Sequence, residues 1–146
     1  MPNIKTILVT GSSGQLGRSL KSIAANYPDY VITFVNRADL DLSDGKSIDN
    51  FFTHHQFDLI INCAAHTTVD KAESEPELAD EINHLAVKQL AELAKQHNTK
   101  IIHISTDYVF NGRQYRPYVE TDEVSPQSVY GETKLKGEQA LLAAMP

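Results

Sequence analysis

Tyr130 and Lys134, which stand four residues apart, are the side chains of this sequence best suited to acid–base chemistry. Both fall in a segment with helical spacing, so they share one face of the predicted helix. A phenol with a reference pKa of about 10 is a weak acid–base catalyst at neutral pH, but a neighbouring ammonium group favours the phenolate. Such pairs also arise by chance on solvated helix faces, so the interpretation needs support from elsewhere in the chain.

A hydroxyl group that can polarise a carbonyl lies earlier in the chain. Thr106 stands in the run Ser-Thr-Asp-Tyr of residues 105–108, where an apolar segment of strand length ends. Its hydroxyl can donate a hydrogen bond to a substrate carbonyl and to the phenol oxygen of Tyr130. Together with a nicotinamide as hydride donor, Thr106, Tyr130 and Lys134 supply the parts for reducing a ketone.

The glycine-rich segment 10–17 predicts a site for the pyrophosphate of a dinucleotide. Gly11, Gly14 and Gly17 have the spacing G-x-x-G-x-x-G between a predicted strand and a predicted helix. Glycines here permit a sharp turn, a close approach of backbone amides to a pyrophosphate, and tight packing of the helix on the strand. The positive end of the helix dipole favours phosphates at the same place. A plain tight turn is the alternative, and the strand–turn–helix context favours the dinucleotide site.

Short apolar runs alternate with longer amphipathic segments. The runs are rich in Ile and Val and predict strands over residues 4–10, 30–35, 58–63 and 100–105. Helical spacing predicts helices over residues 15–25, 44–54, 76–96 and 129 to about 144, and residues 111–127 have the composition of a long ordered loop. Strands that are apolar on both faces predict an α/β fold, a Rossmann-like doubly wound parallel sheet with helices on both faces.

The last predicted helix reaches the end of the sequence with no strand after it. A helix packed on a parallel sheet normally leads the chain through a right-handed crossover into a further strand. We therefore expect residues 1–146 to form one NAD(P)-binding domain, truncated before the last strands and the substrate domain of a longer product. An unusually small sheet is the alternative.

Composition and charge exclude several classes of protein. With 146 residues, 41% of them hydrophobic and 22% charged, the chain resembles an ordinary globular domain. The net charge of −6 argues against nucleic-acid partners, because affinity for phosphates needs clustered Lys and Arg. No apolar run approaches the ~18–20 residues that cross a bilayer, and no signal peptide is visible, so we expect a cytoplasmic protein with no membrane partner. The single cysteine, Cys63, rules out an intrachain disulfide, and the scattered histidines predict no metal site.

Three segments resemble the dTDP-4-dehydrorhamnose reductase family, which belongs to the extended branch of the short-chain dehydrogenase/reductase superfamily. They are residues 62–73 (Asn-x-Ala-Ala-His-Thr-x-Val-Asp-Lys-Ala-Glu), 105–112 (Ser-Thr-Asp-Tyr-Val-Phe-Asn-Gly) and 130–138 (Tyr-Gly-Glu-Thr-Lys-Leu-Lys-Gly-Glu). Cys63 stands where the family usually has alanine, and its side chain is barely larger. The resemblance extends over nearly the whole chain, while members of the family are considerably longer.

The resemblance implies a role for each matching residue. Tyr130 would be the proton donor, Lys134 would bind the nicotinamide ribose and tune Tyr130, and Thr106 would orient the keto group. Asp107 would contact the substrate beside Thr106. The remaining matching positions would bind the cofactor: Gly11, Gly14, Gln15, Leu16 and Gly17 at the pyrophosphate, Asp41 and Leu42 at the adenine edge, and Ala65, His66 and Thr67 at the nicotinamide half.

Two residues leave alternatives open. Arg37 follows the second predicted strand, where an NAD-specific site commonly carries an acidic residue. An arginine there can accept the 2′-phosphate of NADPH, so NADPH is the expected cofactor, with NADH as an option and a solvated loop arginine as the alternative. Asn83 matches a family position near the active site, although a polar residue in the middle of a helix usually faces water.

The resemblance implies an NAD(P)H-dependent oxidoreductase that reduces the 4-keto group of a nucleotide sugar, converting dTDP-4-dehydro-L-rhamnose to dTDP-L-rhamnose for polysaccharide biosynthesis. The nucleotide sugar is the implied partner, and a homodimer is an option. The alternatives are a noncatalytic NADP-binding regulatory subunit of the same fold, and an epimerase or dehydratase acting on another nucleotide sugar. The presence of Thr106, Tyr130 and Lys134 favours an enzyme, and the runs around them favour the reductase.

Overall fold

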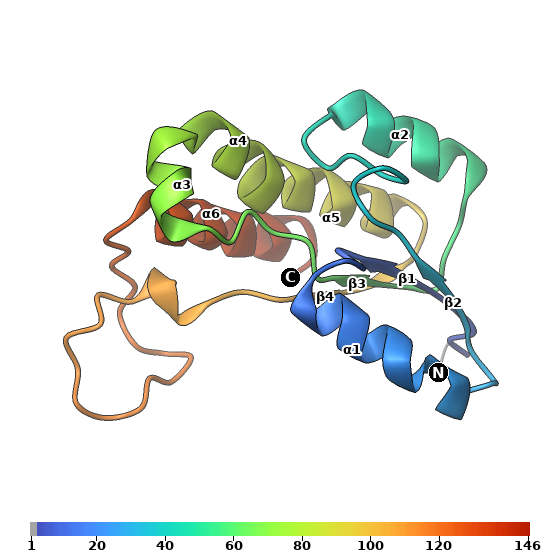
Figure 1. The fold of residues 1–146 in the computed structure, drawn as a ribbon, viewed down its shortest axis with the longest axis horizontal. Coiled ribbons are helices and arrows are strands. Elements are labelled where there is room, and N and C mark those ends of the chain that lie inside the picture. Colours follow the sequence, from blue (N-terminus) through green and yellow to red (C-terminus); the bar gives the residue numbers. More distant parts are fainter. Residues whose placement is uncertain (1–2) are drawn as a thin grey trace.

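The computed structural model describes residues 3–146, and within them four short strands form one parallel sheet (Figure 1). The strands are β1 (Thr6–Thr10), β2 (Val31–Phe34), β3 (Leu59–Asn62) and β4 (Lys100–His103). Their order across the sheet is β2-β1-β3-β4, and each neighbouring pair is parallel. The chain builds outward from β1 first to one side and then to the other. The carboxyl ends of β1 and β3 therefore flank the switch point at which open α/β sheets bind their ligands.

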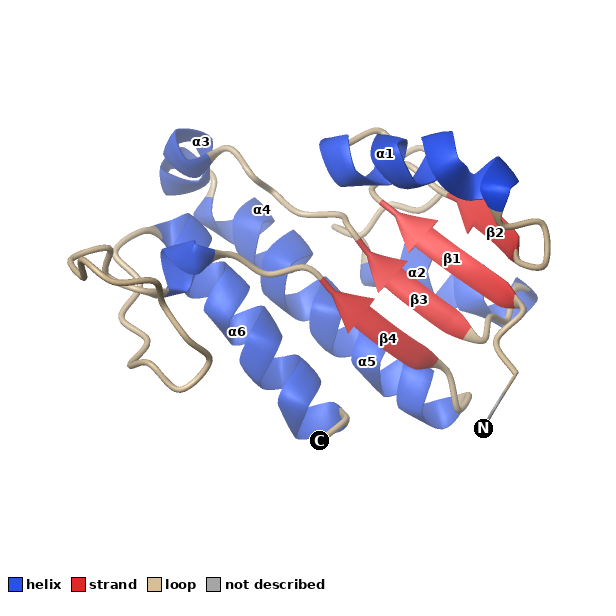
Figure 2. Cartoon of the chain, turned by 90° about the horizontal axis from the view of Figure 1, so that it is seen from below, coloured by secondary structure: helices blue, strands red, loops and turns tan. Residues whose placement is uncertain are grey.

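Helices cover both faces of this sheet (Figure 2). On one face lies α1 (Gln15–Ile23), continued by the short 3-10 turn η1 (Ala24–Asn26). On the other face lie α2 (Gly45–His54) and α5 (Ala86–Gln96), with α6 (Val129–Ala144) packed beside α5. This arrangement confirms the predicted Rossmann-like α/β fold.

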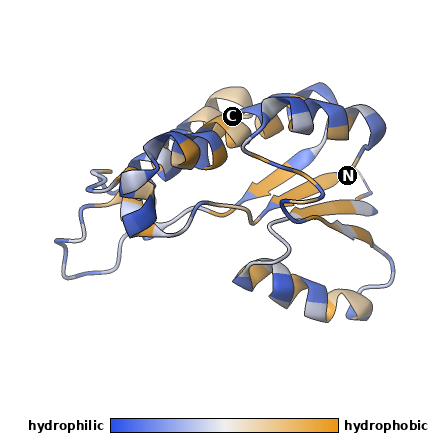
Figure 3. Ribbon diagram, turned by 45° about the horizontal axis from the view of Figure 1, so that its top comes forward, coloured by the Kyte–Doolittle hydropathy of each residue, from blue (hydrophilic) through white to orange (hydrophobic). Residues whose placement is uncertain are grey.

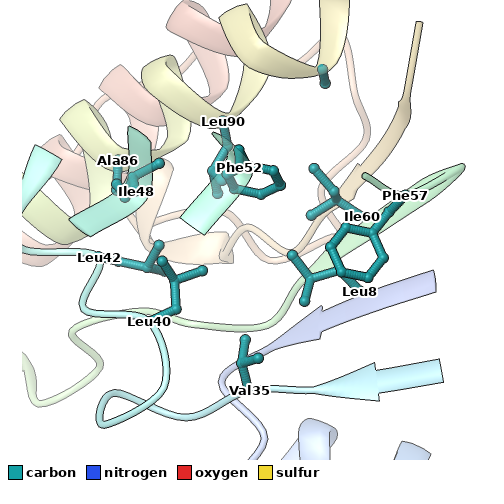
Figure 4. Close-up of a cluster of buried hydrophobic side chains, with 11 residues drawn as sticks. Leu8, Val35, Leu40, Leu42, Ile48, Phe52, Phe57, Ile60, Ala86 and Leu90 are labelled. Carbon is teal, nitrogen blue, oxygen red and sulfur yellow. The ribbon is translucent and has the colours of Figure 1, made fainter. Parts of the chain in front are cut away.

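The core lies mainly between the sheet and the helices α2 and α5 (Figure 4). Leu8 and Ile60 from the strands meet Ile48, Phe52 and Leu90 from these helices, each side chain burying apolar surface worth about 1.5–3 kcal/mol. A smaller cluster on the α1 face is formed by the alternate strand residues, Ile7, Val9 and Leu59. In Figure 3 the strands are largely hydrophobic, while the helices carry both hydrophilic and hydrophobic residues.

One strand departs from the predicted pattern. The apolar run over 100–105 predicts a strand buried on both faces, but Ile102 of β4 is 50% exposed and Ile104, just beyond it, is 40% exposed. β4 is an edge strand, and the residues packed under α1 come from β1, β2 and β3. The strand also ends at His103, so Ile104 and Ser105 belong to the connection that follows.

The helical prediction for residues 76–96 is confirmed in its bounds but not in its regularity. The segment consists of α4 (Pro76–Asp80), a π-helical turn η2 (Glu81–Leu85) and α5. Two short elements, α3 (Val69–Ser74) and the 3-10 turn η3 (Asp107–Val109), were not predicted, because six and three residues are too few to show a period. Residues 110–128 contain no helix or strand, as predicted for the loop.

The loop over residues 110–128 is organised around one carboxylate. Asp122 accepts hydrogen bonds from the backbone amide of Val119 at 2.8 Å and from the guanidinium of Arg116 at 2.9 Å. These bonds, the side-chain one first, hold the pKa of Asp122 below its usual value. The rings of Phe110 and Tyr118 stack, with their centroids 4.2 Å apart. The loop is therefore ordered by its own contacts, although it extends away from the sheet (Figure 1).

The sequence predictions on the cysteine, on metal binding and on membrane spans can be compared with the structure. Cys63 has a free, half-buried thiol, and burial raises its pKa. Across residues 3–146, His, Cys, Asp and Glu side chains form no group of three that could hold a metal ion. In the same part of the chain, no helix has both the length and the apolar composition needed to span a lipid bilayer.

Candidate functional site

The residues predicted to act together meet at the carboxyl edge of the sheet, where β1, β3 and β4 end. The turn after β1 lies against the chain that leaves β3, since a Cβ on Gly11 would come within 2.7 Å of the Ala64 nitrogen. The chain that leaves β4 lies against α6, because the Nζ of Lys134 donates to the carbonyl of Ile104 at 2.6 Å. Segments that are far apart in sequence thus form one continuous edge.

The three glycines of the first turn have different structural roles. Gly11 has a φ of +66°, a conformation that favours glycine, and a Cβ on Gly17 would lie 2.2 Å from the carbonyl oxygen of Gly11. The fold itself therefore requires these two glycines. A Cβ on the exposed Gly14 would meet only the Gly11 oxygen, at an ordinary 3.4 Å. The missing side chain of Gly14 instead leaves open space at the start of α1.

The start of α1 presents backbone amides without a side-chain cap. The first amides of the helix, including those of Gln15 and Leu16, have no intrahelical acceptor. Gly14 is the N-cap residue and has no side-chain oxygen that could accept from them instead. The side chains of Gln15 and Leu16 are exposed. Free amides at the positive end of a helix dipole suit an anion such as a pyrophosphate.

Tyr130 is held by packing around its ring. It is 9% exposed and belongs to a small apolar cluster with Ala72 of α3 and Ala79 of α4. The ring of Tyr108 packs edge-to-face against it, with centroids 5.4 Å apart. The following residue is glycine, and a Cβ on Gly131 would lie 2.3 Å from the Tyr108 carbonyl oxygen. The segment after β4 can therefore lie directly on α6.

Lys134 is the most deeply buried charged side chain described in the structure, at 2% exposure. Burial lowers the pKa of its ammonium to about 8, although the nearby carboxylate of Glu138 opposes the shift. The hydrogen bond to Ile104 fixes the ammonium beside the segment that leads to Thr106. Because Tyr130 lies one helical turn earlier, the positive charge is on the same face of α6 as the phenol.

Thr106 lies between the two points at which its segment touches α6. On one side Ile104 accepts the hydrogen bond from Lys134, and on the other side Tyr108 packs on Tyr130. The Oγ1 of Thr106 accepts a hydrogen bond from the Tyr108 amide at 3.2 Å, which leaves its hydroxyl hydrogen for another acceptor. The structure therefore gathers Thr106, Tyr130 and Lys134. Asp107, the expected substrate contact, is exposed beside Thr106.

A buried polar chain that sequence reasoning missed joins the three strand ends. The hydroxyl of Thr10 donates to Oδ1 of Asn62 at 2.6 Å, and Nδ2 of Asn62 donates to Nδ1 of His103 at 3.1 Å. His103 therefore carries its proton on Nε2. Burial, and secondarily the charge of Lys134, lowers the pKa of His103 to about 4, so its ring is neutral at pH 7. The network fixes the relative positions of β1, β3 and β4.

Asn83 does not face water, and that alternative is wrong. Its side chain is 1% exposed, accepts from the His66 amide at 2.8 Å, and donates to the His66 carbonyl at 3.2 Å and to the Thr133 hydroxyl at 3.1 Å. The buried stripe of this helix also contains Ala79 and Val87, four residues before and after Asn83. Apolar residues four positions before and after Asn83 were the signal in the sequence that its side chain is buried. The amide of Asn83 thus links the loop after β3 to the helix that carries Tyr130.

The loop after β3 is fixed from two directions. Asn83 binds both backbone groups of His66, while the His66 side chain is 8% exposed with Nε2 3.5 Å from the carboxylate of Glu75. Ala65 is half-buried and Thr67 is exposed at the surface of the edge. The segment expected at the nicotinamide half is therefore held in place by contacts within the protein.

At the expected adenine edge the side chains of Leu42, Asp41 and Arg37 differ in how exposed they are. Leu42 is 8% exposed and belongs to the main core, so its side chain is not available to an adenine ring. The carboxylate of Asp41 accepts from the Ser43 hydroxyl at 2.6 Å and its amide at 3.0 Å, bonds that hold the pKa of Asp41 below its usual value. The Arg37 side chain is 76% exposed, with Nε 4.0 Å from Asp41, and is free to meet an anion.

Comparison with known proteins identifies the family of this chain. Residues 5–146 match the family described as the RmlD substrate binding domain. A dTDP-4-dehydrorhamnose reductase from Aggregatibacter actinomycetemcomitans is 40% identical over 140 residues, which are 96% of this chain and 48% of that protein. The chain thus spans about half the length of the curated relatives it matches.

Solved structures give the same result. The crystal structure of a dTDP-4-dehydrorhamnose reductase from Clostridium acetobutylicum is 42% identical, with a TM-score of 0.89, over 95% of this chain and 49% of that one. The reductase from Bacillus anthracis, determined in complex with NADP, is 32% identical, with a TM-score of 0.90, over 99% of this chain and 51% of that one. The resemblance inferred from the motifs is confirmed, and the chain belongs to the RmlD substrate binding domain family.

Proposed function

We propose that residues 1–146 form an NADPH-binding domain in which Tyr130, Lys134 and Thr106 reduce the 4-keto group of a nucleotide sugar. The substrate indicated by the names of the relatives is dTDP-4-dehydro-L-rhamnose. The observation that carries the proposal is the contact of α6 with the chain leaving β4, in which buried Lys134 binds Ile104 while Tyr108 packs on Tyr130. Thr106 lies within the same short segment.

The glycine turn supports a dinucleotide as the cofactor. The fold requires Gly11 and Gly17 but leaves open space at Gly14, where amides of α1 are free to bind a pyrophosphate. The exposed guanidinium of Arg37 lies at the end of β2, where it can bind a 2′-phosphate. The complex of the Bacillus anthracis relative with NADP supports the same choice. NADPH is therefore the proposed cofactor, with NADH as the alternative.

The chain's own residues then have distinct tasks. A bound reduced nicotinamide supplies a hydride to the carbonyl carbon. The phenol of Tyr130 donates its proton to the carbonyl oxygen, and the ammonium of Lys134 stabilises the phenolate that is left. The Thr106 hydroxyl donates a hydrogen bond to the same oxygen and stabilises its developing charge. The phenolate regains a proton from solvent at the end of the cycle.

The experiment separates this function from a noncatalytic NADP-binding role. NADPH titration of the chain, followed by nucleotide fluorescence, is combined with an assay of NADPH consumption and of dTDP-L-rhamnose formed from dTDP-4-dehydro-L-rhamnose. Gly14→Val is the control, because it fills the open space at α1 without a backbone clash at its Cβ. The proposal is supported if the unmodified chain binds NADPH and reduces the sugar, while Gly14→Val no longer binds NADPH. Binding without reduction keeps the dinucleotide site and contradicts sugar reduction by residues 1–146 alone, and no binding contradicts the dinucleotide site.

Two further expectations belong to the same proposal. Both the nucleotide sugar and NADPH are water-soluble, so a cytoplasmic location fits the reaction. A homodimer is tested by sedimentation of the chain with and without NADPH.

A further inference from the structure

The short helix α3 contacts the first turn of the helix that carries Tyr130 (Figure 1). Glu73, near the end of α3, accepts a hydrogen bond through Oε1 from the backbone amide of Val129 at 2.9 Å, although the two residues are 56 positions apart. Val129 is the first residue of α6 and directly precedes Tyr130. From the same helix, Val69 and Ala72 pack in the cluster around Tyr130. One short element thus touches both the backbone and the ring at the proposed proton donor.

The first turn of α6 needs this contact. The N-cap side chain of Ser128 accepts from the amide of Gly131 at 3.0 Å, which satisfies one of the amides that lack an intrahelical acceptor. Glu73 supplies an acceptor for another amide, that of Val129, and places a carboxylate at the positive end of the helix dipole. The bond is therefore charge-assisted, and it comes from a different part of the chain.

The same helix continues the loop expected at the nicotinamide. Residues 65–67 lead into α3, which begins at Val69. Asn83 already connects His66 of this loop to Thr133, three residues after Tyr130. Glu73 connects the same stretch of chain to Val129, one residue before Tyr130. The loop and the helix are therefore joined on both sides of Tyr130.

We propose that Glu73 is a positioning residue, whose hydrogen bond to the Val129 amide holds the phenol of Tyr130 in a fixed position relative to residues 65–67. This inference rests on the proposed function, in which that loop lines the nicotinamide half of the site. A small displacement of a proton donor lowers the rate of the chemical step, while binding contacts made elsewhere persist. Loss of the Glu73 bond should therefore lower kcat and leave the affinity for NADPH nearly unchanged.

The test compares three variants of the chain. Glu73→Ala removes the acceptor, and Glu73→Gln keeps an acceptor oxygen at the same length. Glu77→Ala removes an exposed carboxylate of α4 that makes no side-chain hydrogen bond within residues 3–146, and it is the matched control. Each variant is measured by hydrogen exchange of the Val129 amide, by NADPH titration, and by kcat and KM for sugar reduction.

We expect Glu73→Ala to speed exchange of the Val129 amide and to lower kcat, each roughly tenfold, as the loss of one charge-assisted bond predicts. The KM for NADPH should stay within about twofold, and Glu73→Gln should restore most of kcat. Unchanged exchange in Glu73→Ala, a kcat equal to that of Glu77→Ala, or a rise in KM alone would overturn the proposal. If the unmodified chain reduces no sugar, sugar reduction by residues 1–146 alone is contradicted, while exchange at Val129 still decides whether Glu73 holds the start of α6.

Discussion

Replacing Lys134 with methionine should make the protein more stable at pH 7 while removing its proposed activity. Lys134 is 2% exposed, and its ammonium makes one hydrogen bond, to the carbonyl of Ile104. A charge held in such surroundings destabilises the folded state, because the unfolded chain solvates it fully. Methionine has a similar length and buries no charge.

The magnitude follows from the pKa of Lys134, which burial lowers from 10.5 to about 8. Each pKa unit corresponds to about 1.4 kcal/mol, so the buried charge destabilises the fold by about 3 kcal/mol at pH 7. The variant also loses the bond to Ile104, which is worth about 1 kcal/mol. We therefore expect Lys134→Met to raise the free energy of unfolding by about 2 kcal/mol and Tm by roughly 4–8 °C.

The same lowered pKa of Lys134 also predicts how the stability depends on pH. The folded chain releases the Lys134 proton near pH 8, while the unfolded chain keeps it up to pH 10.5. Between these values the unfolded state binds more protons, so the stability of the unmodified protein rises with pH. The advantage of Lys134→Met should accordingly shrink across this window and be fully present below pH 8.

Urea denaturation at pH 7 and pH 10 measures both effects, with Lys136→Met as the control because Lys136 is exposed on the same helix. A Lys134→Met variant that is less stable than the unmodified chain at pH 7 would refute the reasoning. So would a stability difference that stays constant between the two pH values.

Two further variants test the proton donor and the packing beside it. Tyr130→Phe should lower kcat at least about 100-fold and leave the Kd for NADPH within about twofold, since it removes the proton donor and little binding surface; undiminished turnover would remove Tyr130 from that role. Gly131→Ala should lower the free energy of unfolding by about 2 kcal/mol, because its Cβ would lie 2.3 Å from the Tyr108 carbonyl oxygen. Gly14→Ala is the control in urea denaturation, and equal stability of the two would contradict the close contact of α6 with Tyr108.

The parts of the fold that follow from local pattern could be predicted from the sequence. The four apolar runs became the four strands, and the cap of α2 is Asp44, whose carboxylate accepts from the Lys46 amide at 3.0 Å. Pro76 is the first residue of α4, as its missing amide favours. The extent of burial at β4 was not predictable in this way, because whether Ile102 is covered depends on which element packs on the edge strand.

The candidate site shows a similar division. Motif, spacing and the family resemblance selected Thr106, Tyr130 and Lys134 as candidates, and the structure places their segments in contact. Glu73 and His103, which help to hold them in place, were missed, since they act through contacts across 56 and 41 positions of sequence. The solvent-facing alternative for Asn83 was wrong, because its amide finds hydrogen-bond partners in the loop after β3 and in α6, and sequence spacing does not show those partners.

The central claim is that the glycine turn, the loop after β3 and the Thr106–Tyr130–Lys134 group form one nicotinamide dinucleotide site. Titration of the isotope-labelled chain with NADP⁺, followed residue by residue through backbone amide shifts, tests it most directly. We expect the amides of residues 11–17, 65–67, 106–107 and 130–134 to shift together along one saturation curve. Shifts confined to other parts of the chain, or a response at the glycine turn with none at Thr106 and Tyr130, would contradict it.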